Sequence, residues 1–516
     1  MKKAIVIGAG AAGLATAALL GREGYNVTVV EKNESIGGRS GELTVDGFRF
    51  DTGPSWYLMP DAFEHFFNLL GTTTDAELDM VDLDPAYRLF PEGNAAIDVN
   101  SGREEAIALF ESIEKGAGQK LSNYLDSASE TYQIAVDRFL YTTFSAIGPM
   151  LHKDVRNRLI KLAALLTQPL SKYVAKRFQD HRLRQILTYP AVFLSSHPDR
   201  TPALYHLMSH TDLVQGVRYP QGGFTAVMEA FESLARVNGA RIFLHAEVTA
   251  ITYSGGQTTG VRIRKPDGSA SHLDADLVVS AADLHFTETR LLSPDMRSYD
   301  EKYFAGREPG LSTVLVMLGV KGKLPQLTHH NLLFSKDWDK DFTVVFDGPV
   351  TERPLQSSQS IYISMPSATD PSTAPEGDEN LFILVPTPAI EELGRGDAYS
   401  AEASPAVETI AEAAIDQIAS WCDIPDLRER IVVKRTLGPQ DFAERYYAWR
   451  GGSIGPSHTL RQSAFFRGSN KSRKLDGLYY AGATTVPGVG VPMCLISAEN
   501  VIKRVRGDRS PHQLES

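Results

Sequence analysis

Cysteine is scarce in this sequence, because 516 residues contain only two, Cys422 and Cys494. Two thiols cannot form a disulfide framework or a zinc site with four cysteine ligands, and such sparse usage fits a reducing compartment. The chain also lacks internal repeats. Its 42% hydrophobic and 22% charged residues exclude a collagen-like or disordered protein and predict a globular chain long enough for two or more domains.

Basic residues are in deficit, with 52 lysines and arginines against 63 aspartates and glutamates and a formal net charge of −11. This balance argues against nucleic acid as a partner. The sign of the charge is opposite in the segment from Lys153 to Arg184. It contains nine basic residues and two acidic ones, which gives a local net charge of +7. Leucine-rich stretches alternate with these cations around Pro169. The pattern is typical of basic amphipathic helices on an anionic membrane surface, or of a solvated basic face packed on the core.

Long uncharged runs are nearly absent. The run from Ala4 to Gly21 follows Lys2 and Lys3 and superficially resembles a secretory signal. Three of its four glycines have the spacing G-x-G-x-x-G after a β-branched stretch, which favours a strand, a tight turn and a helix. Once this run is assigned to a folded unit, no stretch long enough to span a membrane remains.

Gly8, Gly10 and Gly13 form the glycine-rich turn of an expected βαβ unit. Its elements are a strand at Ala4–Ile7, a helix at Ala11–Leu20 and a strand at Tyr25–Val30. In such a unit the first glycine permits the turn, the second lets the backbone approach a pyrophosphate, and the third allows close helix packing. Glu31 ends the second strand, where a carboxylate binds a ribose. The sequence therefore predicts a dinucleotide-binding unit.

A second glycine pair, Gly37-Gly38, is followed by Arg39, and Phe50-Asp51-Thr52-Gly53-Pro54 lies shortly beyond. Paired glycines let the backbone approach a ligand, and a guanidinium offers donors to phosphate oxygens. Together with the βαβ unit, these residues resemble the flavoprotein superfamily of amine oxidases, protoporphyrinogen oxidases and phytoene desaturases. The resemblance implies FAD as the cofactor, with contacts in this part of the chain from Gly8, Gly10, Gly13, Glu31, Lys32, Gly38, Arg39, Gly53 and Pro54.

A third block with the same resemblance lies far along the chain. Residues 215–224 contain the pattern G-V-x-Y-P-x-G-G, and an expected helix and the strand Glu247–Ile251 follow. In the superfamily the corresponding strand faces the adenine. The resemblance therefore implies a cofactor contact from Val248.

The fourth block, residues 482–492, reads G-A-T-T-V-P-G-V-G-V-P. It is similar to the signature of the carotenoid-desaturase branch, G-A-x-T-x-P-G-x-G-x-P, and implies cofactor contacts from Gly482, Val489 and Gly490. Val486 stands where many members have histidine, and Met493 where many have glycine. These departures leave the glycine and proline frame intact. They affect only the assignment to a subfamily, and therefore the identity of the substrate.

The resemblance implies an α/β fold, in which a Rossmann-type FAD-binding domain is combined with a discontinuous α+β substrate domain. The expected FAD-binding domain comprises residues 1–95, 213–296 and 466–510, and the substrate and membrane-associating domain comprises 96–212 and 297–465. The Ser- and Pro-rich segment Pro366–Asp378 is expected to be an exposed connection.

The implied activity is FAD-dependent introduction of conjugated double bonds into phytoene, with a lycopene-type product. Such an apolar polyene requires an apolar tunnel. Asp154 is the candidate acid or base, although a role as a helix cap or in an ion pair is the alternative. No metal site is expected. The expected location is the cytoplasm, peripheral on the inner face of the cell membrane.

Two alternatives share parts of this pattern. A carotenoid isomerase or oxidase of the same branch has the same motifs, and a non-catalytic prenyl-binding protein of the GDP-dissociation-inhibitor type has a related fold. The expected partners are the polyene and anionic lipid. The electron acceptor, oxygen or a quinone, and the oligomeric state stay open.

Overall fold

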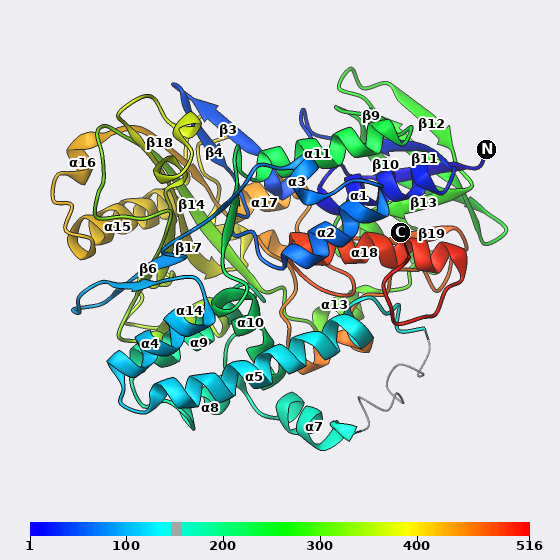
Figure 1. Ribbon diagram of the computed structural model, residues 1–516. Helices are drawn as coiled ribbons and strands as arrows, with labels where there is room; N and C mark the ends of the chain where they lie inside the picture. The colour runs from blue at the N-terminus through cyan, green and yellow to red at the C-terminus, as the bar shows by residue number, and fades with distance from the viewer. Residues whose placement is uncertain (146–156, 516) are drawn as a thin grey trace.

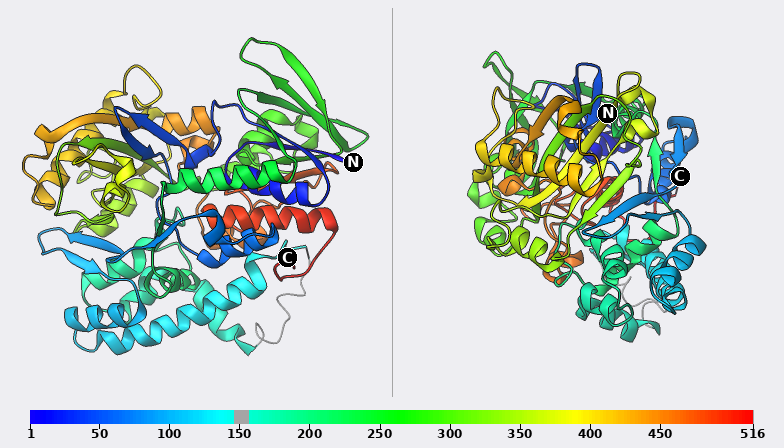
Figure 2. Two further views of the ribbon diagram at one scale, coloured as in Figure 1. Left: turned by 45° about the horizontal axis from the view of Figure 1, so that its top comes forward. Right: turned by 90° about the vertical axis from the view of Figure 1, so that its left-hand side faces the viewer.

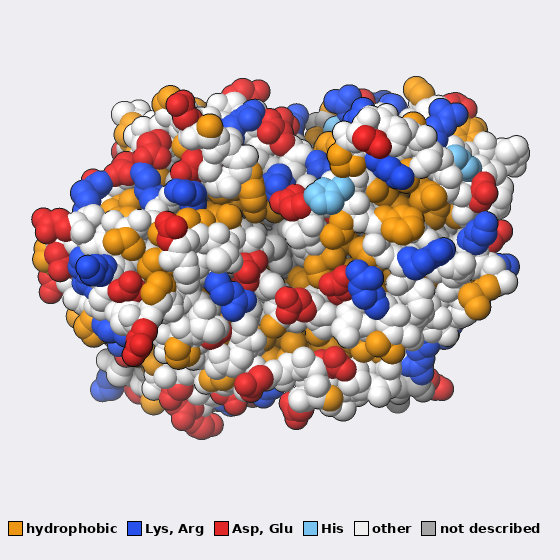
Figure 3. All heavy atoms as spheres, turned by 90° about the horizontal axis from the view of Figure 1, so that it is seen from above, with side chains coloured by type: hydrophobic (Ala, Val, Ile, Leu, Met, Phe, Trp, Pro, Cys, Tyr) orange, Lys and Arg blue, Asp and Glu red, His pale blue; other side chains and the backbone are white. Residues whose placement is uncertain are grey.

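The structure is a computed structural model that describes residues 1–145 and 157–515. The chain forms two lobes, and both termini lie in the lobe that contains α1 (Ala11–Arg22) and α18 (Val491–Arg506) (Figure 1). Seen from above, apolar side chains gather along the boundary between the lobes (Figure 3).

A five-stranded parallel sheet forms the centre of the first lobe. Its strands, in spatial order, are β19 (Leu478–Tyr480), β13 (Leu277–Ser280), β1 (Lys3–Ile7), β2 (Asn26–Val30) and β9 (Arg241–Phe243). The three central strands are rich in valine and isoleucine, as expected for a parallel sheet with both faces covered. Three stretches of sequence far apart in the chain thus build one sheet.

Each face of this sheet packs against a different layer. Ala4 and Val6 of β1 belong to a core shared with α1, α11 (Gly223–Val237) and α18, three helices that Figure 2 shows side by side. Ile5 and Ile7 face the opposite core. There a three-stranded antiparallel sheet covers them, formed by β10 (Glu247–Ser254), β11 (Gln257–Arg264) and β12 (Ala270–Asp274). This is the Rossmann-type α/β arrangement that the sequence predicts.

The second lobe is built on a seven-stranded mixed sheet. Its order is β18 (Ile431–Leu437), β14 (Leu311–Val320), β17 (Glu379–Pro388), β16 (Ile361–Ser364), β15 (His330–Phe334), β6 (Tyr87–Pro91) and β7 (Ile97–Val99). Side chains alternate between its faces. Leu315 and Met317 of β14 point to the interior of the molecule, whereas Val314 and Val316 pack against α15 (Pro405–Trp421).

The sheets do not follow the expected division at residue 95. β6 lies within residues 1–95, yet it pairs in parallel with β15 of the second lobe. Hydrogen bonding between β6 and β7 continues this pairing. A division that follows the sheets therefore starts the second lobe between β5 (Met80–Asp82) and β6, because strands of one sheet share one core.

The remaining elements cover these sheets or connect them. The first lobe also contains α2 (Pro60–Leu69), α3 (Thr74–Glu77), α12 (Leu284–Phe286) and α13 (Glu301–Ala305). The hairpin of β3 (Glu42–Val45) and β4 (Phe48–Asp51) packs against β17 of the second lobe, and β8 (Arg218–Pro220) pairs with β5. The second lobe contains α14 (Trp338–Phe346), α16 (Leu427–Arg430) and α17 (Pro439–Tyr446). At the bottom of Figure 1 lie α4 (Arg103–Ile113), α5 (Ala117–Ala135), α7 (Leu159–Thr167), α8 (Leu170–Ala175), α9 (His181–Thr188) and α10 (Met208–Leu213).

The basic segment forms α7, α8 and α9, separated as expected at Pro169. Most of its apolar side chains are not available to contact a membrane. Leu165, Tyr173 and Phe178, for example, are buried in the core of the second lobe. Among its large apolar side chains that the structure describes, Ile160 and Leu166 are exposed, with exposed fractions of 89% and 38%. Within the described residues, no helix has both the length and the apolar character that crossing a bilayer requires.

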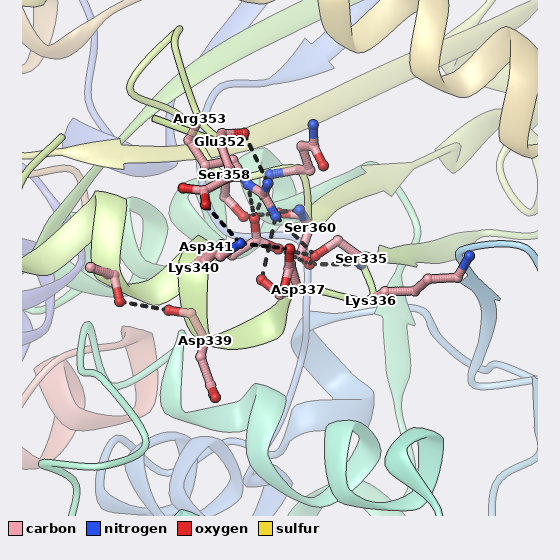
Figure 4. Close-up of polar contacts among 12 residues, drawn as sticks. Ser335, Lys336, Asp337, Asp339, Lys340, Asp341, Glu352, Arg353, Ser358 and Ser360 are labelled. Carbon is pink, nitrogen blue, oxygen red and sulfur yellow. Dashed lines mark hydrogen bonds and ion pairs between the residues drawn. The ribbon is translucent and has the colours of Figure 1, made fainter. Parts of the chain in front are cut away.

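A buried ion pair connects α14 with the loop between α14 and β16 (Ile361–Ser364). Arg353 and Asp341 are 5% and 3% exposed, and Arg353 Nε donates to Asp341 Oδ1 at 2.7 Å. The hydroxyls of Ser335 and Ser360 donate to the other carboxylate oxygen at 2.5 and 2.6 Å (Figure 4). The carboxylate is thus fully hydrogen-bonded, which is what makes its burial tolerable.

We predict that Arg353→Met destabilises the protein by about 3–5 kcal/mol, because it leaves the Asp341 carboxylate buried without a cation. Arg428→Met is the matched control, since Arg428 pairs with Asp416 on the surface and exposed pairs contribute ~0–1 kcal/mol. Thermal unfolding of both variants checks this. Equal losses of stability in the two would contradict it.

Candidate active site

A large cavity opens at the carboxyl ends of the parallel strands, where α/β proteins bind their ligands. It encloses about 490 Å³ and is lined by residues of both lobes. This volume lies within the range of about 300–1,000 Å³ that is typical of ligand pockets. The predicted cofactor residues that line it are Gly8, Gly10, Glu31, Lys32, Gly38, Arg39, Gly53, Pro54, Val248, Gly482, Val489 and Gly490.

Gly13 does not line the cavity but holds α1 against β1. A Cβ atom at Gly13 would lie 1.9 Å from the carbonyl oxygen of Gly8, which is closer than any side chain tolerates. The resulting contact points the amino end of α1 at the cavity, where Gly10, Ala11 and Ala12 form part of the wall. Free N–H groups and the helix dipole make this end a site for an anion.

Glu31 is 6% exposed and ends β2 beside this turn. Its two carboxylate oxygens accept hydrogen bonds from the backbone N–H groups of Ala9 and Asn33 at 2.8 and 2.9 Å. These bonds orient the carboxylate and leave lone pairs for a hydroxyl donor. The backbone N–H of Gly37 donates to Ala9 at 2.9 Å, so the second glycine pair lies directly against the first turn.

Arg39 supplies an unmatched cation at the same end. Its Nε atom is buried with no hydrogen-bond partner, and its Nη2 atom donates to the carbonyl of Gly452 at 3.4 Å. Asp283 also lines the cavity. Burial raises the pKa of Asp283, and the nearby Arg39 charge opposes that shift. An unsatisfied guanidinium beside a helix amino end is the environment in which a pyrophosphate binds.

Lys32 is directed away from this anion site. Its ammonium group lies 3.6 Å from the centre of the Tyr447 ring and donates to the carbonyl of Glu444. Burial lowers its pKa. Tyr447 also stacks on Phe286 at 3.9 Å and, like it, lines the cavity next to Val248. These planar rings form an aromatic wall at the end where the adenine is expected.

The C-terminal glycine block lies at the amino end of α18. Asn470 braces it, because the Nδ2 atom donates to the carbonyls of Tyr480 and Val486 at 3.2 and 3.0 Å. The guanidinium of Arg467 donates to Ala483 and Thr485 at 2.6 and 3.0 Å. Side chains far outside the motif therefore hold its backbone in place.

His458 is a cavity residue that motif analysis missed. Its Nε2 atom accepts a hydrogen bond from the backbone N–H of Val489 at 3.3 Å, and its Nδ1 atom lies 2.8 Å from the hydroxyl of Tyr205. Burial lowers its pKa well below the usual range, so the ring is neutral. The Nδ1 atom then carries the proton and donates to Tyr205. No sequence signal marks His458, since its contacts with Tyr205 and Val489 exist only in the folded chain.

The other half of the cavity is apolar. Its wall contains Trp56, Leu58, Phe193, Leu315, Phe382, Leu384, Phe442 and Ile454. Leu315 and Leu384 come from β14 and β17, which places one face of the seven-stranded sheet opposite the glycine turns. Such a wall excludes water and takes an extended hydrocarbon without demanding hydrogen bonds from it.

The arrangement therefore joins an anion-binding end, built from two helix amino ends and Arg39, to an apolar chamber. A cofactor with a pyrophosphate at one end and a planar redox ring at the other fits this shape. Asp154, the expected acid or base, lies outside the described residues.

Comparison with known proteins agrees with this geometry. The family model of flavin containing amine oxidoreductases matches residues 11–505. A carotenoid 3,4-desaturase of Haloarcula japonica is 38% identical over 98% of both chains. A zeta-carotene-forming phytoene desaturase of Myxococcus xanthus is 32% identical over 98% of this chain and 94% of its own.

Among solved structures, wild-type putrescine oxidase bound to putrescine has a TM-score of 0.61 at 14% identity, covering 98% of this chain and 99% of its own. This similarity confirms the predicted fold class. The chain belongs to the flavin-containing amine oxidoreductase family and is an FAD-dependent oxidoreductase of its carotenoid-desaturase branch.

Proposed function

We propose that this protein introduces conjugated double bonds into phytoene or a closely related acyclic carotene. The observation that carries the proposal is the continuous cavity, in which an anion-binding end meets a long apolar chamber. The desaturases of Haloarcula japonica and Myxococcus xanthus support it by similarity.

In this proposal the polar end holds FAD. Gly10 and the amino end of α1 bind the pyrophosphate with Arg39, and Glu31 binds the adenosine ribose. Val248 lies beside the adenine, and Gly482, Val489 and Gly490 surround the flavin ring. Their positions on the cavity wall support these roles.

Bound FAD supplies a hydride acceptor for a C–H bond next to an existing double bond. The protein's own contribution is to align the chain in the apolar chamber and to exclude water. A neighbouring carbon must also lose a proton, for which Asp154 stays the proposed acceptor. The tyrosine-bound, neutral His458 keeps the Val489 turn in position.

We also propose that the protein works at a membrane surface, where its apolar substrate is dissolved. Two features of the basic segment support this. Ile160 and Leu166 are exposed on α7, Lys172 is exposed on α8, and Lys176 is exposed directly after it. Apolar side chains among cations suit the interface of an anionic leaflet.

The direct test is incubation of the flavin-loaded protein with phytoene in liposomes. We expect new products with longer conjugation, resolved by chromatography and visible absorbance. Geometrical isomers of phytoene with no added conjugation would indicate an isomerase instead. Oxygenated products would indicate an oxidase.

We predict that Glu31→Ala weakens FAD retention about ten- to a hundredfold, because a charge-assisted hydrogen bond contributes ~1.5–3 kcal/mol. Glu34→Ala is the matched control, since the Glu34 side chain is 55% exposed and pairs with Arg445 on the surface. Flavin absorbance per protein after dialysis measures both. Full retention of flavin by the Glu31 variant would contradict the assignment.

Leu384 lies on the chamber wall at a partly exposed position, so a larger side chain extends into free space. We predict that Leu384→Trp lowers phytoene conversion about tenfold, equivalent to ~60 Å² of lost apolar contact at ~25 cal/mol per Å². Flavin content stays unchanged. Leu384→Met, of similar volume, retains conversion. A fall in flavin content together with conversion would place Leu384 at the cofactor instead.

A further inference from the structure

A second pocket lies behind the C-terminal glycine block, on the outer side of the cavity described above. The described residues that line it include four cations, Arg467, Lys471, Arg473 and Arg504, and no acidic residue. Three of these cations come from one short segment, and Arg504 comes from the last turns of α18.

Two of the four cations, the guanidinium groups of Arg467 and Arg504, are withdrawn from water without a counterion among the described residues. Arg467 is 4% exposed, and its described hydrogen bonds all go to backbone carbonyls. Arg504 donates to the carbonyl of Thr143 at 2.6 Å, but its Nε atom is buried with no hydrogen-bond partner in the part of the chain that the structure describes. Among the described residues, neither group forms an ion pair. Burial lowers the pKa of both, that of Arg467 to about 10, so both remain charged at neutral pH.

Nearby acidic groups do not cancel this charge. Asp476 lies 3.5 Å from Lys471 but is on the surface, where such a pair contributes little. Glu288 is buried, and its oxygens already accept from Tyr480 and from the backbone N–H groups of Ser298 and Tyr299. Arg473 lies over the Tyr299 ring at 5.0 Å. Buried cations that lack an anion are costly unless a ligand supplies one.

An exposed apolar segment, residues 460–466, contributes to this basic pocket. Phe465 forms part of its wall and packs edge-on against Phe144 at 4.6 Å. The next residue, Phe466, is 60% exposed, and Leu460 is 45% exposed in the same segment. A free phosphate ion makes no apolar contacts with such side chains. A lipid does, because its acyl chains and glycerol cover them.

We propose that the basic pocket binds the phosphate group of an anionic phospholipid, with Lys471, Arg473 and Arg504 around the phosphate and Phe465 and Phe466 against the lipid's apolar part. This inference rests on the membrane association proposed above and assigns it a specific site. Because Arg467 contacts both the pocket and the Ala483–Thr485 backbone, a bound lipid lies directly behind the flavin-side turn.

The test is flotation of the flavin-loaded protein with vesicles of phosphatidylcholine, with and without phosphatidylglycerol. We expect the Lys471→Ala/Arg473→Ala variant to lose about thirtyfold in affinity for the phosphatidylglycerol vesicles, at about fivefold per cation near a membrane surface. Arg473→Lys keeps the charge and retains binding. Arg473 is exposed, so Arg473→Ala alone serves if the double variant is unstable.

A control variant removes the same charge elsewhere. Lys321→Ala/Lys323→Ala changes two exposed lysines in the turn after β14. We expect it to alter affinity by less than about threefold, since screened surface charges act only over short distances. Lys172→Ala/Lys176→Ala, in the basic segment proposed above to face the membrane, is expected to lower affinity as well. Wild-type affinity in the pocket variant would overturn the proposal.

Inorganic phosphate, compared with sodium chloride at equal ionic strength, separates the two sources of a phosphate group. Complete displacement from the vesicles by phosphate alone would show a site for the free ion and contradict the lipid assignment. The phytoene assay is independent of this result. A wild-type protein that binds phosphatidylglycerol through the pocket but converts no phytoene would disprove the proposed activity and leave the lipid site standing.

Discussion

The structure depends on the close meeting of three backbone turns that belong to distant parts of the chain. A Cβ atom at Gly8 would lie 3.7 Å from the backbone of Ala281, and one at Gly482 would lie 3.4 Å from the Cβ of Ala12. Parallel pairing of β1, β13 and β19 brings these turns to one edge of the sheet. The absence of side chains there leaves backbone N–H groups and two helix amino ends facing one space, which is why we propose this edge as the binding site of an anionic cofactor.

The same space continues into the second lobe because of the alternation of side chains in β14 and β17. Leu315 and Leu384 contribute to the cavity, while Val314 and Ile383 pack on the opposite side with α15. A strand buried on both faces thus separates a solid core from an apolar chamber. The polar and apolar halves of the cavity come from different lobes, so their relative position determines where a substrate meets the cofactor.

Local motifs predicted the βαβ unit well, because each consists of consecutive residues whose backbone conformation carries the chemistry. Its two strands and its helix form where the sequence predicts them, and Glu31 follows the second strand. The division at residue 95 failed, since the pairing of β6 with β15 is a contact between distant segments. Nor does periodicity distinguish an apolar face that meets a membrane from one that meets the core, as Tyr173 and Phe178 show.

The segment Pro366–Asp378 is another case in which the sequence does not reveal a contact between distant residues. Its composition predicts an exposed connection, but Asp370 is 4% exposed and accepts a hydrogen bond from the backbone N–H of Gly222 at 2.8 Å. His458 was equally invisible, because a single histidine in a loop has no pattern. Both residues act through partners far away in the chain, and such contacts follow only from the fold.

If a flavin and an apolar polyene meet in one cavity, mixing the two without oxygen must reduce the flavin. Flavin-loaded protein is mixed with phytoene vesicles in the absence of any electron acceptor, and the visible flavin absorbance is followed through a single turnover. The account predicts bleaching of the oxidised flavin in step with the appearance of a longer conjugated chromophore. A flavin that stays oxidised while bound to phytoene would contradict it.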